Sequence, residues 1–221
     1  MMKRAIAEFF GTALLVAVVV GSGTMAVNIS QDVGVQLLIN TIATIFALGL
    51  LIELLGPISG AHFNPLVTIV SVIRREKSVS ELLFYVVAQC FGGISGALLA
   101  NLMFSNPAIY MSQNSRSGVN LWLGEVVATA GLIFVIFQAI NFGKSKIIPI
   151  LVPAWIGSAY FFTSSTSFAN PAVTVARAFS DTFSGIKLSS VSGFVGAQIV
   201  GALIGYALVL YFTSEKAENH E

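Results

Sequence analysis

Six long apolar stretches constrain this chain more than any other feature of its sequence. An α-helix that crosses about 30 Å of hydrocarbon needs roughly 20 predominantly apolar residues. Stretches of that length recur from one end of the sequence to the other. We therefore predict an all-α membrane protein with six transmembrane helices, at about residues 5–27, 35–55, 80–104, 121–141, 147–164 and 190–212.

The composition supports a location in the lipid bilayer. Of the 221 residues, 56% are hydrophobic and only 10% are charged, whereas soluble domains carry about 25% charged residues. So few charges cannot cover a water-facing globule of this size. The net charge of +1 provides no basic surface for nucleic acid. The single cysteine, Cys90, excludes an internal disulfide and a cysteine-based metal site.

Two further apolar segments are too short to cross the membrane. They cover residues 64–73 and 170–179, and each opens with Asn-Pro. Proline suits the first helical position, because its missing N–H would have no intrahelical partner there. We predict that each segment is a half-helix that enters the membrane and stops midway.

The two halves of the chain carry the same motifs in the same order. The matching pairs are Glu8 with Glu125 in a Glu-x-x-x-Thr-Ala context, Asn64-Pro65 with Asn170-Pro171, and Gln89 with Gln198, each followed by two glycines four residues apart. Repeat 1 spans about 5–104 and repeat 2 about 121–212, within a single domain over 1–221. Three spans per repeat is an odd number, so the second copy must insert upside down. Inverted repeats place a site at their interface near the midplane.

The basic residues predict how the chain is oriented, because cytoplasmic loops collect lysine and arginine. Three of them, Arg116, Arg177 and Lys187, fall on one side of the predicted spans. The remaining eight fall on the other side: Lys3, Arg4, Arg74, Arg75, Lys77, Lys144, Lys146 and Lys216. We therefore expect both termini to be cytoplasmic.

Asn64 and Asn170 are the predicted centre of a pore. Two opposed half-helices bring their positive N-terminal ends together at the midplane, and each asparagine can point an amide donor into the space between them. Paired donors orient a water molecule, and the paired dipoles resist the passage of cations. The alternative is that each asparagine only caps its helix. Matching positions in an inverted repeat favour the pore.

These motifs resemble the aquaporin or major intrinsic protein family over nearly the whole length of the chain. The resemblance rests on Ser-Gly-Ala-His-Phe-Asn-Pro at 59–65, on Asn-Pro-Ala at 170–172 and on the paired glutamates and glutamines. It implies six spans with two half-helices, one passive pore per subunit, homotetramers in the cell inner membrane, and neither enzyme activity nor a cofactor or metal. It also implies that Glu8 and Glu125 brace the two re-entrant loops. Leu66 stands where the family usually has alanine.

The same resemblance places the selectivity filter at four positions counted from the two asparagines. These positions are Thr44, Ser158, Ser167 and Val173, although a small insertion would give the second place to Tyr160. Val173 stands where the family usually carries arginine. Valine with threonine and serine neighbours predicts a wide, neutral and weakly polar opening. We expect water and glycerol-like polyols to pass.

The loop around the second half-helix narrows the resemblance. Residues 163–174 and 180–183 resemble a bacterial subgroup often encoded beside arsenic-resistance genes, which implies passage of neutral arsenite. Two alternatives stay open: a narrow water-selective channel and, from another class, a coupled secondary transporter. The transporter would need ion-binding groups at the midplane, and neither half-helix carries a carboxylate there.

Three further residues have two possible roles each, and one further motif is expected to have no role in the pore. His62 either gates one mouth on protonation or is a loop histidine with satisfied hydrogen bonds. Arg177 either contributes to the filter or binds loop carbonyls. Glu53 either reaches the membrane interface or faces the vestibule. A third Asn-Pro-Ala, at residues 106–108, has no counterpart in the second repeat and is expected to be an ordinary turn.

Overall fold

The computed structural model describes residues 1–218, with side chains described through residue 213, and this part of the chain contains helices and loops but no strand. Six helices are long and apolar enough to cross a membrane. They are α1 (Met2–Ile29), α2 (Val33–Ser59), α4 (Val79–Met103), α5 (Val119–Asn141), α6 (Ile148–Phe162, preceded by the 3-10 turn η1 at Ser145–Ile147) and α8 (Leu188–Glu218). The predicted six-span, all-α architecture is confirmed. The side chain of Lys216 lies outside the described side chains.

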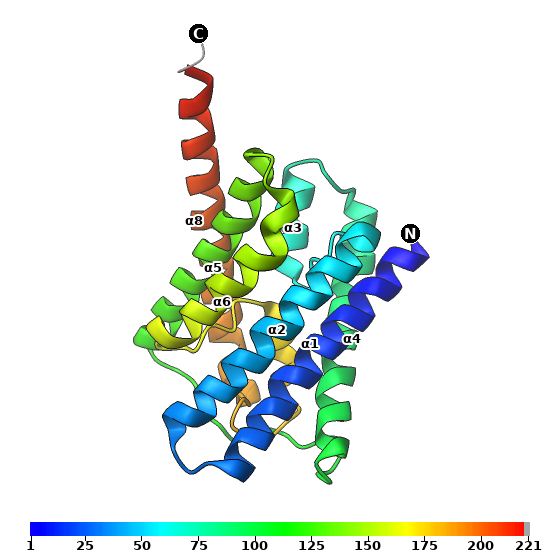
Figure 1. The fold of residues 1–221 in the computed structure, drawn as a ribbon, viewed down its shortest axis with the longest axis vertical. Coiled ribbons are helices and arrows are strands. Elements are labelled where there is room, and N and C mark those ends of the chain that lie inside the picture. Colours follow the sequence, from blue (N-terminus) through cyan, green and yellow to red (C-terminus); the bar gives the residue numbers. More distant parts are fainter. Residues whose placement is uncertain (219–221) are drawn as a thin grey trace.

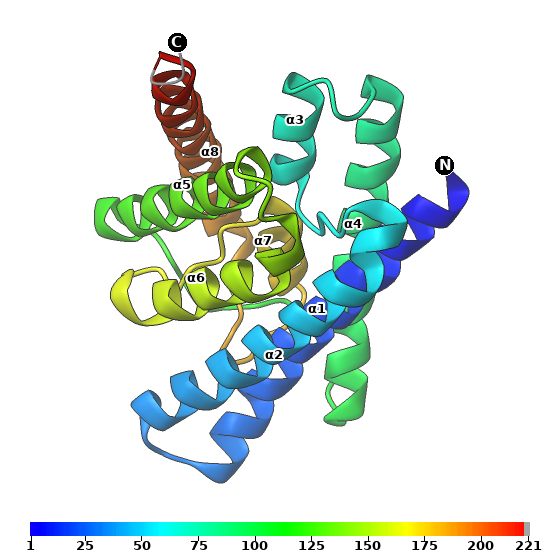
Figure 2. The same ribbon diagram turned by 45° about the horizontal axis from the view of Figure 1, so that its top comes forward.

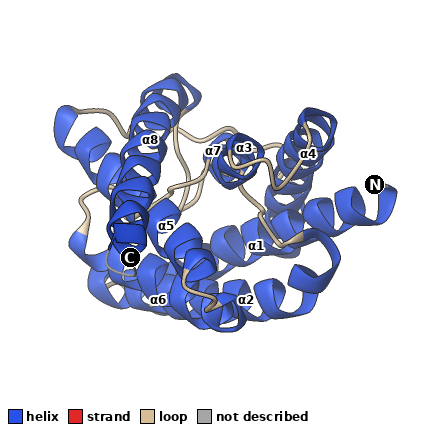
Figure 3. Ribbon diagram, turned by 90° about the horizontal axis from the view of Figure 1, so that it is seen from above, coloured by secondary structure: helices blue, strands red, loops and turns tan. Residues whose placement is uncertain are grey.

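The two short helices are also present where the Asn-Pro pairs predicted them. They are α3 (Pro65–Ile73) and α7 (Pro171–Arg177), and each has proline in its first turn and asparagine as its N-cap. Seen from above, α3 and α7 overlap near the middle of the molecule, between α4 and α8 (Figure 3). Helix α3 also contacts α7 directly, so the half-helices meet inside the bundle.

The long helices pack in two equivalent groups. Helix α1 packs along α4 and α2, and α5 packs along α8 and α6 (Figures 1 and 2). Each short helix also contacts the other half, since α7 packs against α4 and α1, and α3 touches α8. The N-terminus lies in the upper half of Figure 1 and α8 ends at its top, whereas the loop after α1 lies at the bottom.

Glycines set the close crossing of the paired helices. A methyl carbon built on Gly96 of α4 would lie 2.1 Å from the Ala13 carbonyl oxygen of α1, and one on Gly205 of α8 would lie 2.3 Å from the Ala130 carbonyl oxygen of α5. Small residues at this spacing let two helix backbones approach each other inside a membrane. The two glycine pairs seen in the sequence are thus packing sites of the inverted repeat.

Substitution of Gly96 by leucine is expected to prevent folding or to lower stability severely. The obstructing atom is a backbone oxygen of α1, which no side-chain rotation can move, and overpacking of a tight core already costs about 1–3 kcal/mol where side chains can adjust. The measurement is the thermal unfolding of the detergent-solubilised protein. Gly196→Ala is the matched control, because a methyl carbon there meets nothing within 4 Å. Equal stability of the two variants would contradict the assigned crossing.

Candidate pore between the half-helices

A cavity of about 220 Å³ passes between the tips of the two half-helices. It is lined by both asparagines, Asn64 and Asn170, and by side chains of α1, α2, α5 and α6. Its wall extends from Glu76, just beyond α3, to Arg177 at the far end of α7. The cavity thus follows the path expected of a pore, with the asparagines at its middle.

Each asparagine joins its own helix to the opposite loop. Asn64 Oδ1 accepts from the Leu66 N–H at 2.9 Å, and Asn64 Nδ2 donates to the Ala169 carbonyl at 2.8 Å. Asn170 Oδ1 accepts from the Ala172 N–H at 2.9 Å, and its Nδ2 donates to the Phe63 carbonyl at 2.7 Å. Capping and pore lining are therefore not alternatives here. An amide nitrogen carries two hydrogens, so the second one on each asparagine is available to the cavity.

Glu8 holds the first re-entrant loop from inside the bundle. Its two carboxylate oxygens accept from the His62 N–H at 3.0 Å, the Phe63 N–H at 2.7 Å and the Ser59 hydroxyl at 2.6 Å. Gln89 of α4 donates to the same carboxylate at 2.8 Å. A fully buried carboxylate is expensive unless such donors surround it. This geometry supplies the bracing contacts that the family resemblance implied.

Glu125 holds the second loop in the same manner. It accepts from the Phe168 N–H at 2.8 Å, the Ala169 N–H at 2.9 Å and the Gln198 amide at 2.6 Å. Gln198 also donates to Thr174 Oγ1 at 2.8 Å, and the equivalent pair in the first repeat is Gln89 with Thr68 at 3.1 Å. These threonines, each four residues after a pore asparagine, were not predicted as site residues. Their matching positions in the two repeats were a signal that could have identified them.

The braced loops contain backbone that L-residues rarely adopt. Phe63 and Ala169, the residues just before the two pore asparagines, have φ of 48° and 50°. A positive φ is uncommon for residues with a β-carbon, and it persists only where the surroundings fix it. The glutamate hydrogen bonds to these two N–H groups do so. They turn the adjacent carbonyls toward the opposite asparagine.

Three of the predicted filter residues line the cavity. Thr44 and Ser167 are each 3% exposed, and neither hydroxyl has a hydrogen-bond partner within the described side chains. Val173 lies on the same wall and is 5% exposed. Buried hydroxyls without a partner cost free energy. Both oxygens are covered in this structure, so a molecule in the cavity would reach them only after these side chains rotate. The wall at this level is neutral and weakly polar.

Of the two residues predicted for the second filter position, Ser158 and Tyr160, only Tyr160 lines the cavity. Ser158 is exposed on α6, donates to the Ala154 carbonyl at 2.8 Å and does not line the cavity, whereas Tyr160 is 4% exposed and does. Two residues along a helix differ by about 200° in direction, so the two candidates point to opposite sides. The residues of α6 that line the cavity are Ile148, Val152, Ile156 and Tyr160, which share one face at four-residue spacing.

Arg177 both binds a loop carbonyl and lines the cavity. Its Nε donates to the Ser184 carbonyl, and its guanidinium carbon lies 3.4 Å from the centroid of the Phe168 ring. The side chain is 3% exposed and forms part of the cavity wall. Helix α7 runs outward from the asparagines, so Arg177 lies one helical turn farther from the pore centre than Val173.

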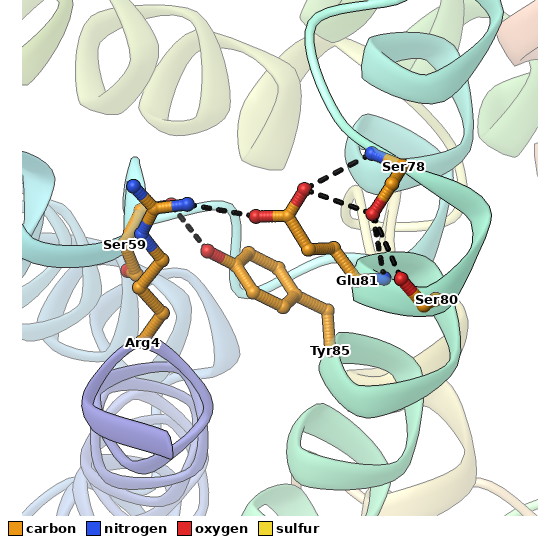
Figure 4. Close-up of polar contacts among 6 residues, drawn as sticks. All are labelled: Arg4, Ser59, Ser78, Ser80, Glu81 and Tyr85. Atoms are coloured by element: carbon orange, nitrogen blue, oxygen red, sulfur yellow. Dashed lines mark hydrogen bonds and ion pairs between the residues drawn. The ribbon is translucent and has the colours of Figure 1, made fainter. Parts of the chain in front are cut away.

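His62 lines the cavity at the side of the half-helix α3. Its Nδ1 lies 3.0 Å from Thr68 Oγ1, and its ring packs edge to face on Tyr85 with centroids 5.5 Å apart. Tyr85 itself donates to the Ser59 carbonyl at 2.7 Å (Figure 4). The histidine is therefore a hydrogen-bonded wall residue; a gating role stays a prediction.

Polar contacts near Tyr85 join α1 to the start of α4. Arg4 of α1 pairs with Glu81 of α4 at 2.7 Å, and Glu81 also accepts from Ser78, which caps α4 (Figure 4). Lys77 lies with its ammonium 4.8 Å from the centroid of the Tyr85 ring. Burial lowers the pKa of Lys77, and the Glu81 charge acts in the opposite direction. These contacts hold the loop beside this mouth.

The remaining residues considered in the sequence analysis do not line the cavity. The third Asn-Pro-Ala, at residues 106–108, lies in a loop after α4, where Asn101 Nδ2 donates to the Ala108 carbonyl at 2.9 Å. Glu53 is exposed on α2 and does not line the cavity. Cys90 is half-buried on α4, also outside the cavity.

Comparisons with known proteins agree with this geometry. The family described as Major intrinsic protein matches residues 1–168. The chain belongs to this family of passive membrane channels, and it is not an enzyme.

Individual relatives support the same assignment. Aquaglyceroporin AqpS of Rhizobium meliloti (strain 1021) is 47% identical over 207 residues, which cover 94% of this chain and 88% of that protein. Aquaporin-4 of Mus musculus is 26% identical over 217 residues, covering 92% and 67%. The X-ray structure of the aquaglyceroporin from Plasmodium falciparum has a TM-score of 0.66 at 19% identity, covering 96% of this chain and 95% of the other, and it supports the fold.

Proposed function

We propose that this protein passes water together with small uncharged polyhydroxy solutes, such as glycerol and neutral arsenite. The proposed filter consists of Thr44, Tyr160, Ser167 and Val173. The bilayer is its environment and small neutral solutes are its ligands. No step requires a cofactor, because the pore needs only a continuous path and donors that replace the hydration of the solute.

The observation that carries this proposal is the neutral wall around Val173. Arginine at this position would place a large charged group across the opening, whereas valine leaves the cross-section free. The partnerless hydroxyls of Thr44 and Ser167 line the same cavity. Rotation of these two side chains would turn their hydroxyls toward the lumen, where a solute with several hydroxyls can pair with both while its carbon skeleton contacts the apolar wall. The name of the bacterial relative, an aquaglyceroporin, supports the same solute class.

Tyr160 favours the second candidate, a narrower and water-selective pore. An aromatic ring takes up more of the opening than a serine side chain does. A filter with Tyr160 is therefore narrower than the same filter with Ser158. Tyr160 lines the cavity, and its hydroxyl adds a polar group to the side chains of the wall. We favour the wider pore because the position three residues after Asn170 carries valine rather than arginine.

Orientation, membrane and assembly are part of the proposal. The excess of basic residues on the side of the termini supports cytoplasmic termini in a bacterial inner membrane. Large apolar side chains such as Phe46, Leu50 and Leu54 are exposed on α2, as expected of surfaces that face lipid or a neighbouring copy. The homotetramer rests on the family resemblance. Cross-linking of the protein in its native membrane tests it.

The direct test is solute uptake by purified protein in liposomes. We expect glycerol and arsenite to enter protein-containing vesicles much faster than empty ones, with a rate proportional to the gradient and independent of a proton gradient. Saturable, proton-dependent uptake would instead indicate coupled transport. Fast water flux without glycerol or arsenite uptake would indicate the narrow pore.

Substitution of Tyr160 by alanine is expected to raise glycerol permeability several-fold, because it removes the largest side chain from the proposed filter. Ser158→Ala is the matched control on the same helix and should leave the permeability unchanged, since Ser158 faces away from the cavity. Stopped-flow light scattering under a glycerol gradient measures both variants. A larger effect at Ser158 than at Tyr160 would reverse the assignment.

A further inference from the structure

The guanidinium of Arg177 is buried at the cavity wall and has most of its donors free. The side chain is 3% exposed, and its one hydrogen bond within the described side chains runs from Nε to the Ser184 carbonyl. An arginine carries five N–H donors, so the four on the two terminal nitrogens have no acceptor among the described residues. These nitrogens are not among the fully buried atoms that lack a partner, so water or a solute in the cavity can reach them.

Two contacts fix the direction of these free donors. The Nε bond anchors one edge of the guanidinium, and the Phe168 ring stacks against its face at 3.4 Å. The flat group therefore has little freedom to turn, and its terminal nitrogens form a preorganised fork on the wall. Phe168 directly follows Ser167, whose partnerless hydroxyl lines the same cavity.

The charge of Arg177 is not neutralised by an ion pair among the described residues. The carboxylate of Glu125 is occupied by two backbone N–H groups and the Gln198 amide. A second cation, Arg116, lies on the same ring, with its guanidinium carbon 5.3 Å from the Phe168 centroid. The donors of Arg116 are directed to the Gly185 and Phe183 carbonyls, and this residue does not line the cavity. Arg177 is thus the cation on this part of the cavity wall whose donors remain available to a ligand.

We propose that Arg177 binds small monovalent oxyanions at this mouth, and that a bound oxyanion blocks the pore. The ligand class follows from the fork, because two parallel N–H donors match two oxygens of one anion. The anion stops there, since the wall beyond includes Leu48, Ile156 and Val173 and would strip its hydration without compensation. The proposal rests on the proposed pore, because it needs an open path for the anion to obstruct.

The test measures osmotic water flux in proteoliposomes as chloride is replaced by methanesulfonate at constant ionic strength. Methanesulfonate stays ionised, so no neutral form leaks through the lipid. We expect wild-type water permeability to fall by more than half as methanesulfonate rises, and Arg177→Gln to lose this sensitivity. Arg116→Gln is the matched control, because it removes the charge on the other side of Phe168 and should keep the block.

Arg177→Lys guards against a glutamine variant that does not fold. It retains the charge but not the fork, and we expect a weaker block than in the wild type. Wild-type flux that is indifferent to methanesulfonate would overturn the proposal, as would equal block in the wild type and in Arg177→Lys, or loss of block in Arg116→Gln alone. Absence of water flux before any anion is added would instead refute the proposed pore.

Discussion

Arginine in place of Val173 is expected to reduce glycerol and arsenite permeability at least tenfold while water flux persists. The new guanidinium would cross the proposed filter of Thr44, Tyr160 and Ser167, and it would obstruct a solute more than a single water molecule. A tenfold slower passage corresponds to a barrier higher by about 1.4 kcal/mol. Stopped-flow light scattering under glycerol and sucrose gradients measures both permeabilities in the same vesicles.

Val173→Leu separates size from charge in this experiment. Leucine adds bulk without donors, so we expect a smaller loss of glycerol permeability than with arginine. Equal permeability of the wild type and Val173→Arg would show that selectivity lies elsewhere along the cavity. A parallel loss of water and glycerol flux would point to a damaged fold, which thermal unfolding of the variant would reveal.

Glu125→Leu is expected to lower the free energy of unfolding by about 3 kcal/mol or more. The substitution leaves the Phe168 and Ala169 N–H groups and the Gln198 amide without their acceptor, and each buried unsatisfied donor costs about 1–3 kcal/mol. Relief from burying a carboxylate offsets part of this loss. The measurement is thermal unfolding in detergent, followed by water flux of the protein that remains folded.

Glu125→Gln tests whether acceptor atoms or charge matter more. Glutamine keeps one oxygen of similar reach, so we expect a smaller loss of stability. Glu8→Leu should behave like Glu125→Leu, because the two carboxylates hold their loops through equivalent contacts. A leucine variant at either position with wild-type stability would show that the loops keep their shape without the carboxylate.

The fold was predictable from the sequence because few backbone structures can cross a lipid bilayer. Backbone polar groups in hydrocarbon must be satisfied within a helix, so six apolar stretches had to be six helices. The half-helices were predictable for a local reason, since Asn64-Pro65 and Asn170-Pro171 supply both an N-cap and a first-turn proline. Helix ends were less predictable: α2 continues to Ser59, four residues past the expected end, before Gly60 with φ of 95° stops it.

The filter was only partly predictable, and Ser158 shows why. Counting residues back from Asn170 fails when the length of a loop is unknown, and a shift of two residues reverses the side of the helix. Helical periodicity gives a better signal. Val152, Ile156 and Tyr160 recur at intervals of four and all line the cavity, as Thr44, Leu48 and Ile52 do on α2. A bond from Arg177 to a loop carbonyl was one of the two predicted readings, but its partners Ser184 and Phe168 were not predictable, because they meet it only through the folding of the loop.

The reflection coefficient for glycerol tests the central claim most directly. It is obtained by comparing the shrinkage of the same wild-type proteoliposomes under equal osmotic gradients of glycerol and sucrose. A pore with a wide, neutral filter at Val173 predicts a coefficient well below unity, because glycerol follows the water through the channel. A coefficient of unity with fast water flux would contradict that account and make Tyr160 the wall of a water-selective constriction.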